Sequence, residues 1–599
     1  MSGIVAVVNR DGAPVDVRLL RRLTDALKHA GPDAQDVWVD GAVGLGHAWL
    51  GTGRDASAGS QPLTLDGQTW ITADARVDAR EDLVRALSAH GREPAPEAPD
   101  AALILHAYGA WGEACVGKLL GDYAFAIWDG ARRRLLCARD HFGVKPLYYA
   151  ETPSSVIVST SLDCVRRHPG VSAALDDAVI VSFLRDGATD DPAATAFRHV
   201  RRVPAAHCLV VGERIAVKRY WRLPVDGEVR YRRGVDYVER FTELLEHAIA
   251  DRLGTREVGV LMSGGLDSTT VAATAKRCLS REPSPFTLRA YTTVCERIIP
   301  DPESRYATLA ARALGIPLHV RVADDYQPFE RWDKPELRRP EPEGDPLLAI
   351  HVDQLNDAAT NGRVLLTGHG ADPAMRLPAS YAVDRLKRGE LARLASEVGA
   401  YIAYRHRFPR LRLGRHLRRW LSREAAPPVS PPAWLRATDG ASRDARASMP
   451  AHPTRRHAYE LLTSPDWPQL FETYDANVTG VPVHVRHPWF DRRVVEYLLA
   501  IPPMPWCFDK TIVRVAMRGV LPDAIRLRPK TVAAGDALVA LLAAPGARWI
   551  DAFTPTPALE EYVRRARVPR VCGEQDATAV WTHLRPLCLD YWLRAHGDG

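Results

Sequence analysis

The stretch that most constrains this chain is Met262–Thr270, which reads Met-Ser-Gly-Gly-Leu-Asp-Ser-Thr-Thr. A short apolar run, Val258–Met262, precedes it and predicts a buried parallel strand, and Thr269–Lys276 predicts a helix after it. A strand, a Ser-Gly-Gly turn and a helix N-terminus form an anion cradle, because glycines let backbone N–H groups approach closely and the helix dipole favours negative charge. Asp267 adds a carboxylate where a phosphate and Mg²⁺ would meet.

This loop resembles the pyrophosphate-binding loop, Ser-Gly-Gly-x-Asp-Ser, of enzymes that split ATP into AMP and pyrophosphate. It differs from the Gly-x-x-x-x-Gly-Lys-Ser/Thr loop, which lets the γ-phosphate be cleaved. The alternative is an ordinary strand–turn–helix with glycines for packing, but six residue types fall in order at the junction. The resemblance implies that the nucleotide is bound by Leu261, Ser263, Gly264, Gly265, Asp267 and Ser268.

Composition limits the class of protein. With 599 residues, 46% of them hydrophobic and 25% charged, the chain has the make-up of a globular protein of several domains. No apolar run reaches membrane-spanning length, and the start, Met1–Ala6, lacks a secretory pattern. Nine cysteines without a Cys-x-x-Cys pair indicate a reducing cytoplasm and argue against structural zinc or disulfides. A net charge of +6 is small for this length, so we expect neither a nucleic-acid nor a membrane partner.

The first part of the chain, residues 1–205, predicts an α/β sandwich. It has frequent short strands, such as Ile4–Val8 and Ala124–Trp128, separated by glycine-rich turns, with helical periodicity at Val17–Leu27 and Arg80–Leu87. A linker and a long amphipathic helix ending near residue 251 open the second predicted domain, residues 206–599.

In this second domain strands alternate with helices, which predicts a doubly wound parallel sheet. Ligands of such a sheet bind at the carboxyl ends of the strands, where Ser263 and Thr367 both fall. Beyond residue 380 the pattern becomes helical. The predicted strands are Val258–Met262, Arg289–Val294, Leu318–Val322 and Val364–Thr367, and the predicted helices between them include Ala307–Leu314 and Ala349–Ala359.

Further motifs support a resemblance over nearly the whole chain. The N-terminal half contains Gly59–Pro62, Gly121–Phe125 and Arg139–Tyr149, and the C-terminal half contains Gly368–Asp372, Arg486–Asp491, Lys510-x-x-x-Arg514, Leu521-Pro522 and Arg528-Pro529-Lys530. With the Ser-Gly-Gly loop, these motifs resemble the asparagine synthetase family in type and order. The resemblance implies a glutaminase-like (Ntn-type) sandwich followed by an ATP-pyrophosphatase synthetase domain.

The glutaminase half departs from the family at three places. The family begins Met-Cys-Gly and its cysteine attacks glutamine, whereas Ser2 stands here, and a serine hydroxyl is a far weaker nucleophile unless a base activates it. The glutamine-binding Asn-Gly-Glu is replaced around Ala73-Asp74-Ala75, and Ala48 follows His47 where an arginine is expected. These losses imply a degenerate glutaminase domain kept as structure, with N-terminal serine catalysis as the alternative.

The synthetase half departs at the loop after the fourth predicted strand. Asparagine synthetases have Gly-Glu-Gly-x-Asp-Glu there, whereas this chain has Gly-His-Gly-Ala-Asp-Pro at Gly368–Pro373, so both glutamates are lost. β-Lactam synthetases carry a tyrosine where His369 stands. With Asp74–Glu81 and Pro431–Leu435, the chain looks most like the lasso-peptide cyclases, which adenylate an Asp or Glu side chain of a ribosomal peptide and close a macrolactam onto its N-terminus.

That resemblance implies ATP and Mg²⁺ as cofactors and a precursor peptide as substrate, with a leader-binding protein and a leader protease as candidate partners. Asp267 and Asp372 are the expected Mg²⁺ ligands, since each follows a different strand end; the alternatives are a helix cap and a turn residue. Lys530 is expected to stabilise charge developing on the acyl-adenylate. Gly368 and Lys510 are assigned to the nucleotide site, although Lys510 and Arg514, at i and i+4, could instead pair with acidic neighbours.

His369 leaves two interpretations open. It could take the proton of an attacking amine, since its ordinary pKa lies near neutrality, or it could contact phosphate or only fill space. The arginine run Arg405–Arg423 predicts a solvated helix face rather than a docking surface for an acidic partner.

Ammonia-dependent asparagine synthetase and β-lactam synthetase are the alternatives within the ligase class. A tRNA-modifying adenylating enzyme would share the Ser-Gly-Gly loop, but the glutaminase-like half and the lack of Cys-x-x-Cys oppose it. A non-catalytic scaffold is opposed by the retention of Asp267, Asp372 and Lys530.

Overall fold

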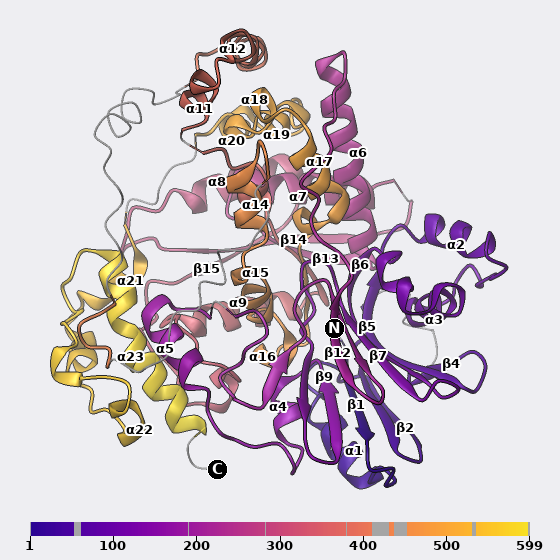
Figure 1. Ribbon diagram of the computed structural model, residues 1–599. Coiled ribbons are helices and arrows are strands. Elements are labelled where there is room, and N and C mark those ends of the chain that lie inside the picture. Colours follow the sequence, from indigo (N-terminus) through magenta and orange to yellow (C-terminus); the bar gives the residue numbers. More distant parts are fainter. Residues whose placement is uncertain are drawn as a thin grey trace.

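Two antiparallel sheets and one parallel sheet organise the chain (Figure 1). This computed structural model describes residues 2–52, 61–189, 191–281, 283–378, 380–409, 431–436, 452–529 and 535–596. Within those ranges no helix is both long enough and apolar enough to cross a membrane.

The two antiparallel sheets lie face to face in the N-terminal part, as the strand-rich sequence predicts. The first has the order β10-β8-β9-β1-β3-β2 and the second β12-β11-β7-β6-β5-β4. Their strands are β1 (Gly3–Asn9), β2 (Ala34–Asp40), β3 (Val43–Trp49), β4 (Leu63–Thr64), β5 (Thr69–Val77), β6 (Gly121–Asp129), β7 (Arg134–Arg139), β8 (Tyr148–Glu151), β9 (Ser155–Ser159), β10 (Val200–Arg202), β11 (His207–Val211) and β12 (Ile215–Arg219).

Helices cover the outer faces of both sheets, so central strands such as β1 and β6 are buried on both sides, whereas the edge strands β2 and β12 are partly exposed. In β1, Ile4 and Ala6 face the second sheet whereas Val5 and Val7 belong to the core on the helical side, the period of two that a strand imposes. The helices of this part are α1 (Val17–Asp25), α2 (Arg80–Ser88), α3 (Asp100–Trp111), α4 (Leu162–Arg166) and α5 (Asp177–Asp186). Because β11 and β12 complete the second sheet, the sandwich continues past residue 205, where the sequence placed the boundary.

The third sheet is parallel, with the order β15-β14-β13-β16-β17. This is the predicted doubly wound arrangement, and the strand order reverses between β13 and β16. Its elements are α6 (Gly234–Leu253), β13 (Glu257–Leu261), α7 (Leu266–Leu279), β14 (Thr287–Val294), α8 (Glu303–Leu314), β15 (Leu318–Val322), α9 (Leu348–Ala359), β16 (Val364–Leu366) and β17 (His484–Arg486).

The fifth strand, β17, corrects the expectation that the chain beyond residue 380 is helical throughout. It has three residues with polar types at both ends, so neither an apolar run nor an alternation marks it. The other described elements of this part are helical: α10 (Ala371–Ala374), α11 (Tyr381–Lys387), α12 (Leu391–Arg405), α14 (Arg456–Leu462), α15 (Asp466–Glu472), α16 (Ala476–Thr479), α17 (Arg492–Ala500), α18 (Pro503–Trp506), α19 (Thr511–Ala516), α20 (Asp523–Arg526), α21 (Ala537–Leu542), α22 (Pro557–Glu560) and α23 (Ala577–His596).

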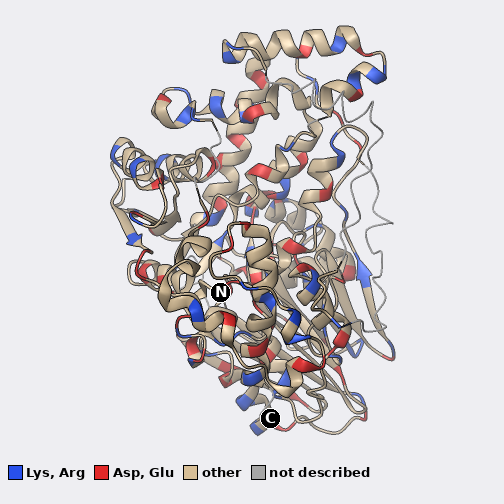
Figure 2. Ribbon diagram, turned by 90° about the vertical axis from the view of Figure 1, so that its left-hand side faces the viewer, with Lys and Arg blue, Asp and Glu red and all other residues tan. Residues whose placement is uncertain are grey.

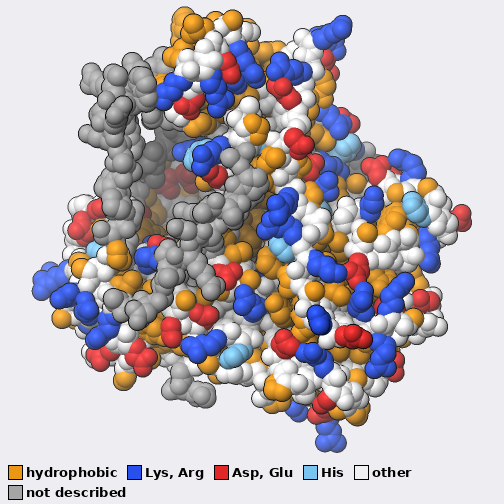
Figure 3. Space-filling model, viewed as in Figure 1, with side chains coloured by type: hydrophobic (Ala, Val, Ile, Leu, Met, Phe, Trp, Pro, Cys, Tyr) orange, Lys and Arg blue, Asp and Glu red, His pale blue; other side chains and the backbone are white. Residues whose placement is uncertain are grey.

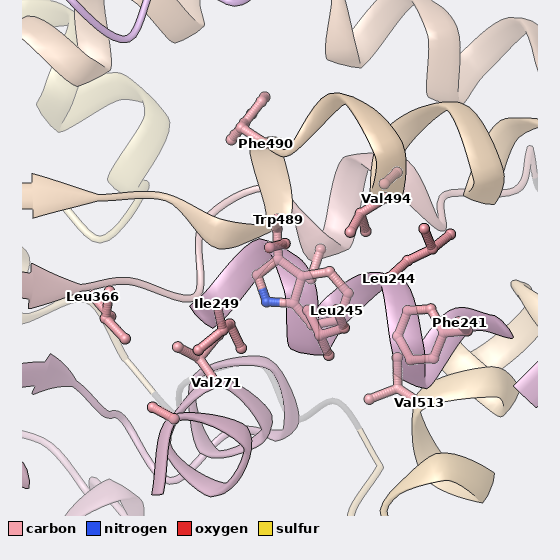
Figure 4. Close-up of a cluster of buried hydrophobic side chains, with 14 of the residues drawn as sticks. Phe241, Leu244, Leu245, Ile249, Val271, Leu366, Trp489, Phe490, Val494 and Val513 are labelled. Carbon is pink, nitrogen blue, oxygen red and sulfur yellow. The ribbon is translucent and has the colours of Figure 1, made fainter. Parts of the chain in front are cut away.

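Helix α6 is the centre of the synthetase core. Figure 4 shows Phe241, Leu245 and Ile249 on this helix beside the ring of Trp489, with Val271 of α7 nearby. Trp489 is fully buried and its ring stacks 6.0 Å from that of Phe241. These contacts hold α7, and with it the glycine loop, against the helical C-terminal part.

The surfaces in view carry charges of mixed sign. Positions of Lys and Arg are interspersed with those of Asp and Glu along the ribbon in the side view (Figure 2), and side chains of both signs are interspersed over the face in Figure 3. A surface mixed in this way produces a weak field for steering a charged ligand over long distances.

A buried ion cluster joins the sandwich to the synthetase part. Arg252, near the end of α6, lies 2.7 Å from Asp491, 3.2 Å from Asp78 and 3.4 Å from Asp122. Each of these four residues is at most 3% exposed. Burial alone would raise the pKa of Asp491, but Arg252 and Arg493 lower it to about 2. The arginines therefore favour the ionised form of Asp491, whereas burial raises the pKa of Asp78 in spite of Arg76 and Arg252.

We predict that Arg252→Met lowers the free energy of unfolding by about 2–4 kcal/mol, because three buried carboxylates lose one of their cations. Arg76 still pairs with Asp78 and Asp122, and Arg493 still pairs with Asp491. Urea denaturation followed by fluorescence would measure it. Arg240→Met on the same helix is the control: that side chain is 45% exposed and pairs with Glu243 in solvent, so its loss costs at most about 1 kcal/mol. Equal effects of the two substitutions would contradict the structural role of the cluster.

Candidate active site

The glycine loop has the geometry expected from the sequence. β13 ends at Leu261, Gly265 caps α7, and Gly264 has a φ of 71°, in the left-handed region that glycine tolerates. A Cβ at Gly264 would lie 2.5 Å from the backbone nitrogen of Ala307, so the turn packs directly against α8. The first turn of α7 thus presents its N–H groups from a rigid position.

The loop after β16 meets this helix end. A Cβ at Gly368 would come within 2.9 Å of the backbone nitrogen of Ser268, so only glycine allows the two loops to touch. The contact lies at the carboxyl ends of β13 and β16, where the strand order of the sheet reverses. Gly368 therefore acts through packing that brings Asp372 toward the α7 N-terminus.

Lys510 connects the two predicted metal ligands. Its ammonium nitrogen lies 2.5 Å from an oxygen of Asp267 and 2.6 Å from an oxygen of Asp372. The exposed fractions of the Asp267, Asp372 and Lys510 side chains are 20%, 42% and 17%, so the group is open to solvent on the Asp372 side. The two carboxylates converge on the Lys510 ammonium, so a metal ion bound between them would take the place of that group.

Asp509 fixes the position of Lys510. Both residues have positive φ angles, 50° and 52°, which residues other than glycine rarely adopt. The surrounding structure must therefore hold the backbone in this conformation. Asp509 accepts hydrogen bonds from Arg405 at 2.8 Å, from Arg514 at 3.2 Å and from Arg407. The strained backbone is thereby tied to α12 and α19.

These contacts resolve two expectations. Arg514 pairs with Asp509 and with backbone oxygens, the second of the two roles that the sequence left open. At the described start of the arginine run, the Arg405 side chain is only 3% exposed and is bound to Asp509, whereas the Arg407 side chain is 46% exposed, as a solvated face requires. Residues 410–423 of that run lie outside the described residues.

One cavity is lined by five of the eleven predicted site residues. Its volume is about 820 Å³, and its lining includes Ser263, Gly265, Asp267, Asp372 and Lys510. Two further polar residues, Glu303 and Arg528, line the same cavity, and burial raises the pKa of Glu303.

The sequence gave no functional signal for Glu303 or Asp509. Glu303 opens α8, far along the chain from the glycine loop, and only the packing of α8 against that loop shows its proximity. Asp509 precedes a predicted site residue, but its role depends on an arginine from α12. Arg528 belongs to the Arg528-Pro529-Lys530 motif noted in the sequence. Its guanidinium lies 3.8 Å from the centre of the Tyr306 ring.

His369 does not line that cavity. Its Nε2 atom lies 3.0 Å from the Tyr474 hydroxyl, and its backbone N–H donates to Thr367. Burial lowers the pKa of His369, so the ring is neutral near pH 7 and could accept a proton, but it faces Tyr474 and the buried His487 rather than Asp267. The geometry therefore favours a positioning role for His369 over contact with phosphate.

Two of the remaining predicted residues are buried or partly buried beside the glycine loop, and the third lies outside the described residues. Leu261 is partly buried and packs against the core on the sheet, and Ser268 is buried in the first turn of α7. The hydroxyl oxygen of Ser268 has no hydrogen-bond partner among the described residues. Lys530 lies outside the described residues, so its predicted role stays a prediction.

These residues fit a magnesium nucleotide. A glycine turn that a Cβ would fill, the N-terminus of a 14-residue helix and an unsatisfied Ser268 hydroxyl together suit a phosphate. Among the described residues no cluster of three or more His, Cys, Asp or Glu could hold a metal by itself. Two carboxylates with room for phosphate oxygens are the set that Mg²⁺ commonly uses.

The sandwich retains a pocket of about 420 Å³ at Ser2. The Ser2 hydroxyl accepts a hydrogen bond from the Leu50 backbone at 3.3 Å, and no described histidine or carboxylate is hydrogen-bonded to it. Asp74, which lines the pocket, is bound by the buried Lys145 at 2.7 Å. Burial would raise the pKa of Asp74, but Lys145 lowers it. The carboxylate is therefore favoured in its ionised form, and the ammonium of Lys145 balances its charge.

Comparison with known proteins agrees with this two-part arrangement. Residues 1–221 match the glutamine amidotransferase domain and residues 240–594 match asparagine synthase. Asparagine synthetase [glutamine-hydrolyzing] 3 of Bacillus subtilis is 25% identical, covering 85% of this chain and 83% of its own. Asparagine synthetase [glutamine-hydrolyzing] 2 of the same organism is 23% identical over 88% of this chain and 71% of its own. Amidase chyE of Penicillium rubens is 24% identical over 81% and 78%.

We predict that Gly264→Ala destabilises the protein by about 2–4 kcal/mol and abolishes turnover, because it adds backbone strain and a clash with α8. Gly265→Ala is a matched control. Its φ is −75° and the new Cβ would meet only the Ser263 hydroxyl, at 3.3 Å. Urea midpoints of both variants would test the difference, and equal destabilisation would show that the turn does not depend on Gly264.

Proposed function

The chain belongs to the asparagine synthase family, whose members are ATP-dependent, AMP-forming carbon–nitrogen ligases, and we propose that it closes a macrolactam on a peptide. In this reaction the carboxylate of an Asp or Glu side chain attacks the α-phosphorus of ATP and pyrophosphate leaves. The N-terminal amine of the same peptide then attacks the acyl-adenylate carbonyl and displaces AMP, which leaves an amide.

The observation that carries this proposal is the room beside the adenylation site. The cavity at Asp267 and Lys510, about 820 Å³, shares Pro378, Tyr381 and His457 with a second cavity of about 670 Å³. A nucleotide and one free amino acid would leave the second cavity unused, whereas a peptide could extend into it. Holding both ends of one peptide converts amide formation into an intramolecular step, which raises the effective concentration of the amine.

The state of the sandwich supports an amine source other than glutamine. Ser2 stands in the position of the family's cysteine without a hydrogen-bonded base among the described residues, and Asp74 is occupied by Lys145. The sandwich would therefore not release ammonia from glutamine for use in amide formation. The alternative, an asparagine synthetase supplied with free ammonia, is favoured by the curated relatives, which are named for asparagine synthesis.

The residues take distinct roles in this mechanism. The N-terminus of α7 and Ser268 would bind phosphate, and Asp267 and Asp372 would hold Mg²⁺, which neutralises the pyrophosphate that leaves. Lys510, held by Asp509, places a positive charge between the two carboxylates and beside the phosphates. His369 and Tyr474 orient the loop that carries Asp372.

We predict that a linear peptide with a free N-terminus and an internal Asp or Glu, given ATP and Mg²⁺, yields a product one water lighter together with stoichiometric AMP. Mass spectrometry and nucleotide chromatography would measure both. Acetylating the N-terminus, or replacing the acidic residue with its amide, removes a reacting group and should stop closure. Asp372→Asn should lower the rate about 100-fold or more.

The matched control for this experiment is Asp523→Asn, an exposed carboxylate paired with Arg526, which should retain the rate. Formation of ADP, or efficient conversion of free aspartate and ammonia to asparagine without dehydration of any peptide, would overturn the proposal in favour of the alternative.

We also predict that glutamine is neither required nor hydrolysed, because no side chain among the described residues is hydrogen-bonded to the Ser2 hydroxyl as an activating base. Incubation with glutamine, followed by an enzymatic glutamate assay, should show release no faster than without protein. Ser2→Ala should leave ligation unchanged. Glutamate release at an enzymatic rate that Ser2→Ala removes would identify Ser2 as a nucleophile instead.

A further inference from the structure

A separate cavity lies between the sandwich and the helices α14 and α15, which Figure 1 shows near the centre of the molecule. We call it the interface pocket. Its volume is about 710 Å³, within the range of small-molecule sites, which often lie between domains. Its sandwich side consists of residues 139, 141–142, 192, 202 and 204–207, and its linker side of residues 219 and 221–223. The helical side consists of residues 459, 462–465 and 467–469. It shares no lining residue with the cavities at Ser2 or Lys510.

Aromatic rings form the walls of the interface pocket. Trp221 packs edge-on against His141 at 5.0 Å and against Phe142 at 5.6 Å between ring centres. Trp467, on the helical side, donates its indole N–H to the Leu461 carbonyl at 2.6 Å, so its polar atom is already satisfied. The rings therefore offer flat apolar surface to an occupant.

The charge of the interface pocket is positive. No Asp or Glu is among its described lining residues. The deep Arg139 and Arg202 are both neutralised by Glu472, at 3.1 Å in each case. In contrast, neither Arg219 nor Arg222 forms an ion pair with any described carboxylate.

These two arginines lie three residues apart at the exposed side of the pocket. Arg219 donates only to His207, at 3.4 Å, and burial together with the charge of Arg222 lowers the pKa of Arg219. Two neighbouring guanidinium groups without a counter-charge are the donors that bind carboxylate, sulfonate or phosphate groups well.

His141 contributes a buried ring to the wall of the interface pocket. The residue is only 4% exposed, and its Nε2 atom is enclosed, with no hydrogen-bond partner among the described residues. Burial and Arg492 lower the pKa of His141 to about 3, so the ring is neutral and can donate or accept one hydrogen bond.

We propose that the interface pocket binds a small organic anion with a flat apolar body, such as an aromatic carboxylate. The ring system would lie against the tryptophan rings of the wall, and the anionic group would pair with Arg219 and Arg222. Since the pocket is separate from the ligase cavity, the proposal does not depend on which amide the enzyme forms.

Anilinonaphthalenesulfonate has this chemistry and can serve as the probe, with the neutral phenylnaphthylamine as its uncharged counterpart. Fluorescence titration of the full chain should show saturable binding of one equivalent of the anion. Arg219→Gln combined with Arg222→Gln should weaken the anion about tenfold or more, the usual effect of losing hydrogen bonds to a charged group. The affinity for the neutral probe should stay the same.

The matched control replaces Arg564 and Arg570, two exposed arginines elsewhere on the surface, with Gln and should leave both probes unaffected. All variants should keep the wild-type melting temperature, since the substituted side chains are exposed. The proposal would be overturned if the wild type binds no saturable equivalent, if the Arg219 and Arg222 substitutions leave the anion affinity unchanged, or if both probes weaken equally.

Discussion

The buried contact of Arg252 with Asp78, Asp122 and Asp491 is the interaction on which the arrangement of the two halves depends. Removing these charges from water is costly, and the arrangement persists because each carboxylate meets an arginine within 3.4 Å. The carboxylates come from the sandwich and from the segment after β17, and the arginine comes from α6. One cation thus sets the position of the long helix against both, and α6 in turn carries the core that supports α7.

The candidate site is assembled from segments far apart in the chain. Asp267 and Lys510 are 243 positions apart, and Asp372 comes from a third segment. Steric restrictions in the backbone hold the loops: Gly264 and Gly368 have no room for a side chain. Electrostatics then hold the side chains, since Lys510 bridges two carboxylates and Asp509 is held by arginines.

The parts that the sequence predicted well are those with local causes. The glycine turn, the strand before it and the helix after it are determined within about 15 residues of each other, so spacing alone identified them. The parallel sheet followed from alternation of apolar runs, but β17 has only three residues and is defined by its neighbour β16.

Features that depend on long-range contacts were missed or wrongly weighted. The described start of the arginine run was expected in solvent, and a carboxylate about 100 positions away buries Arg405 instead. His369 was placed at the chemistry from its position in a motif, whereas its side chain turns toward Tyr474. Charge pairing of this kind has no periodic signal, because the partner lies on another element.

The packing of α23 has a consequence for how the protein is made. This helix, the last described element, covers α5 and packs Trp592 against Phe197, 5.6 Å between ring centres, so residues made late complete the core of residues made early. N-terminal domains generally fold first during synthesis. Here the sandwich emerges from the ribosome with Phe183 and Phe197 still uncovered, and it must remain in a partly exposed state until α23 arrives. Chaperone contact and aggregation during translation should therefore concentrate on the α5 surface.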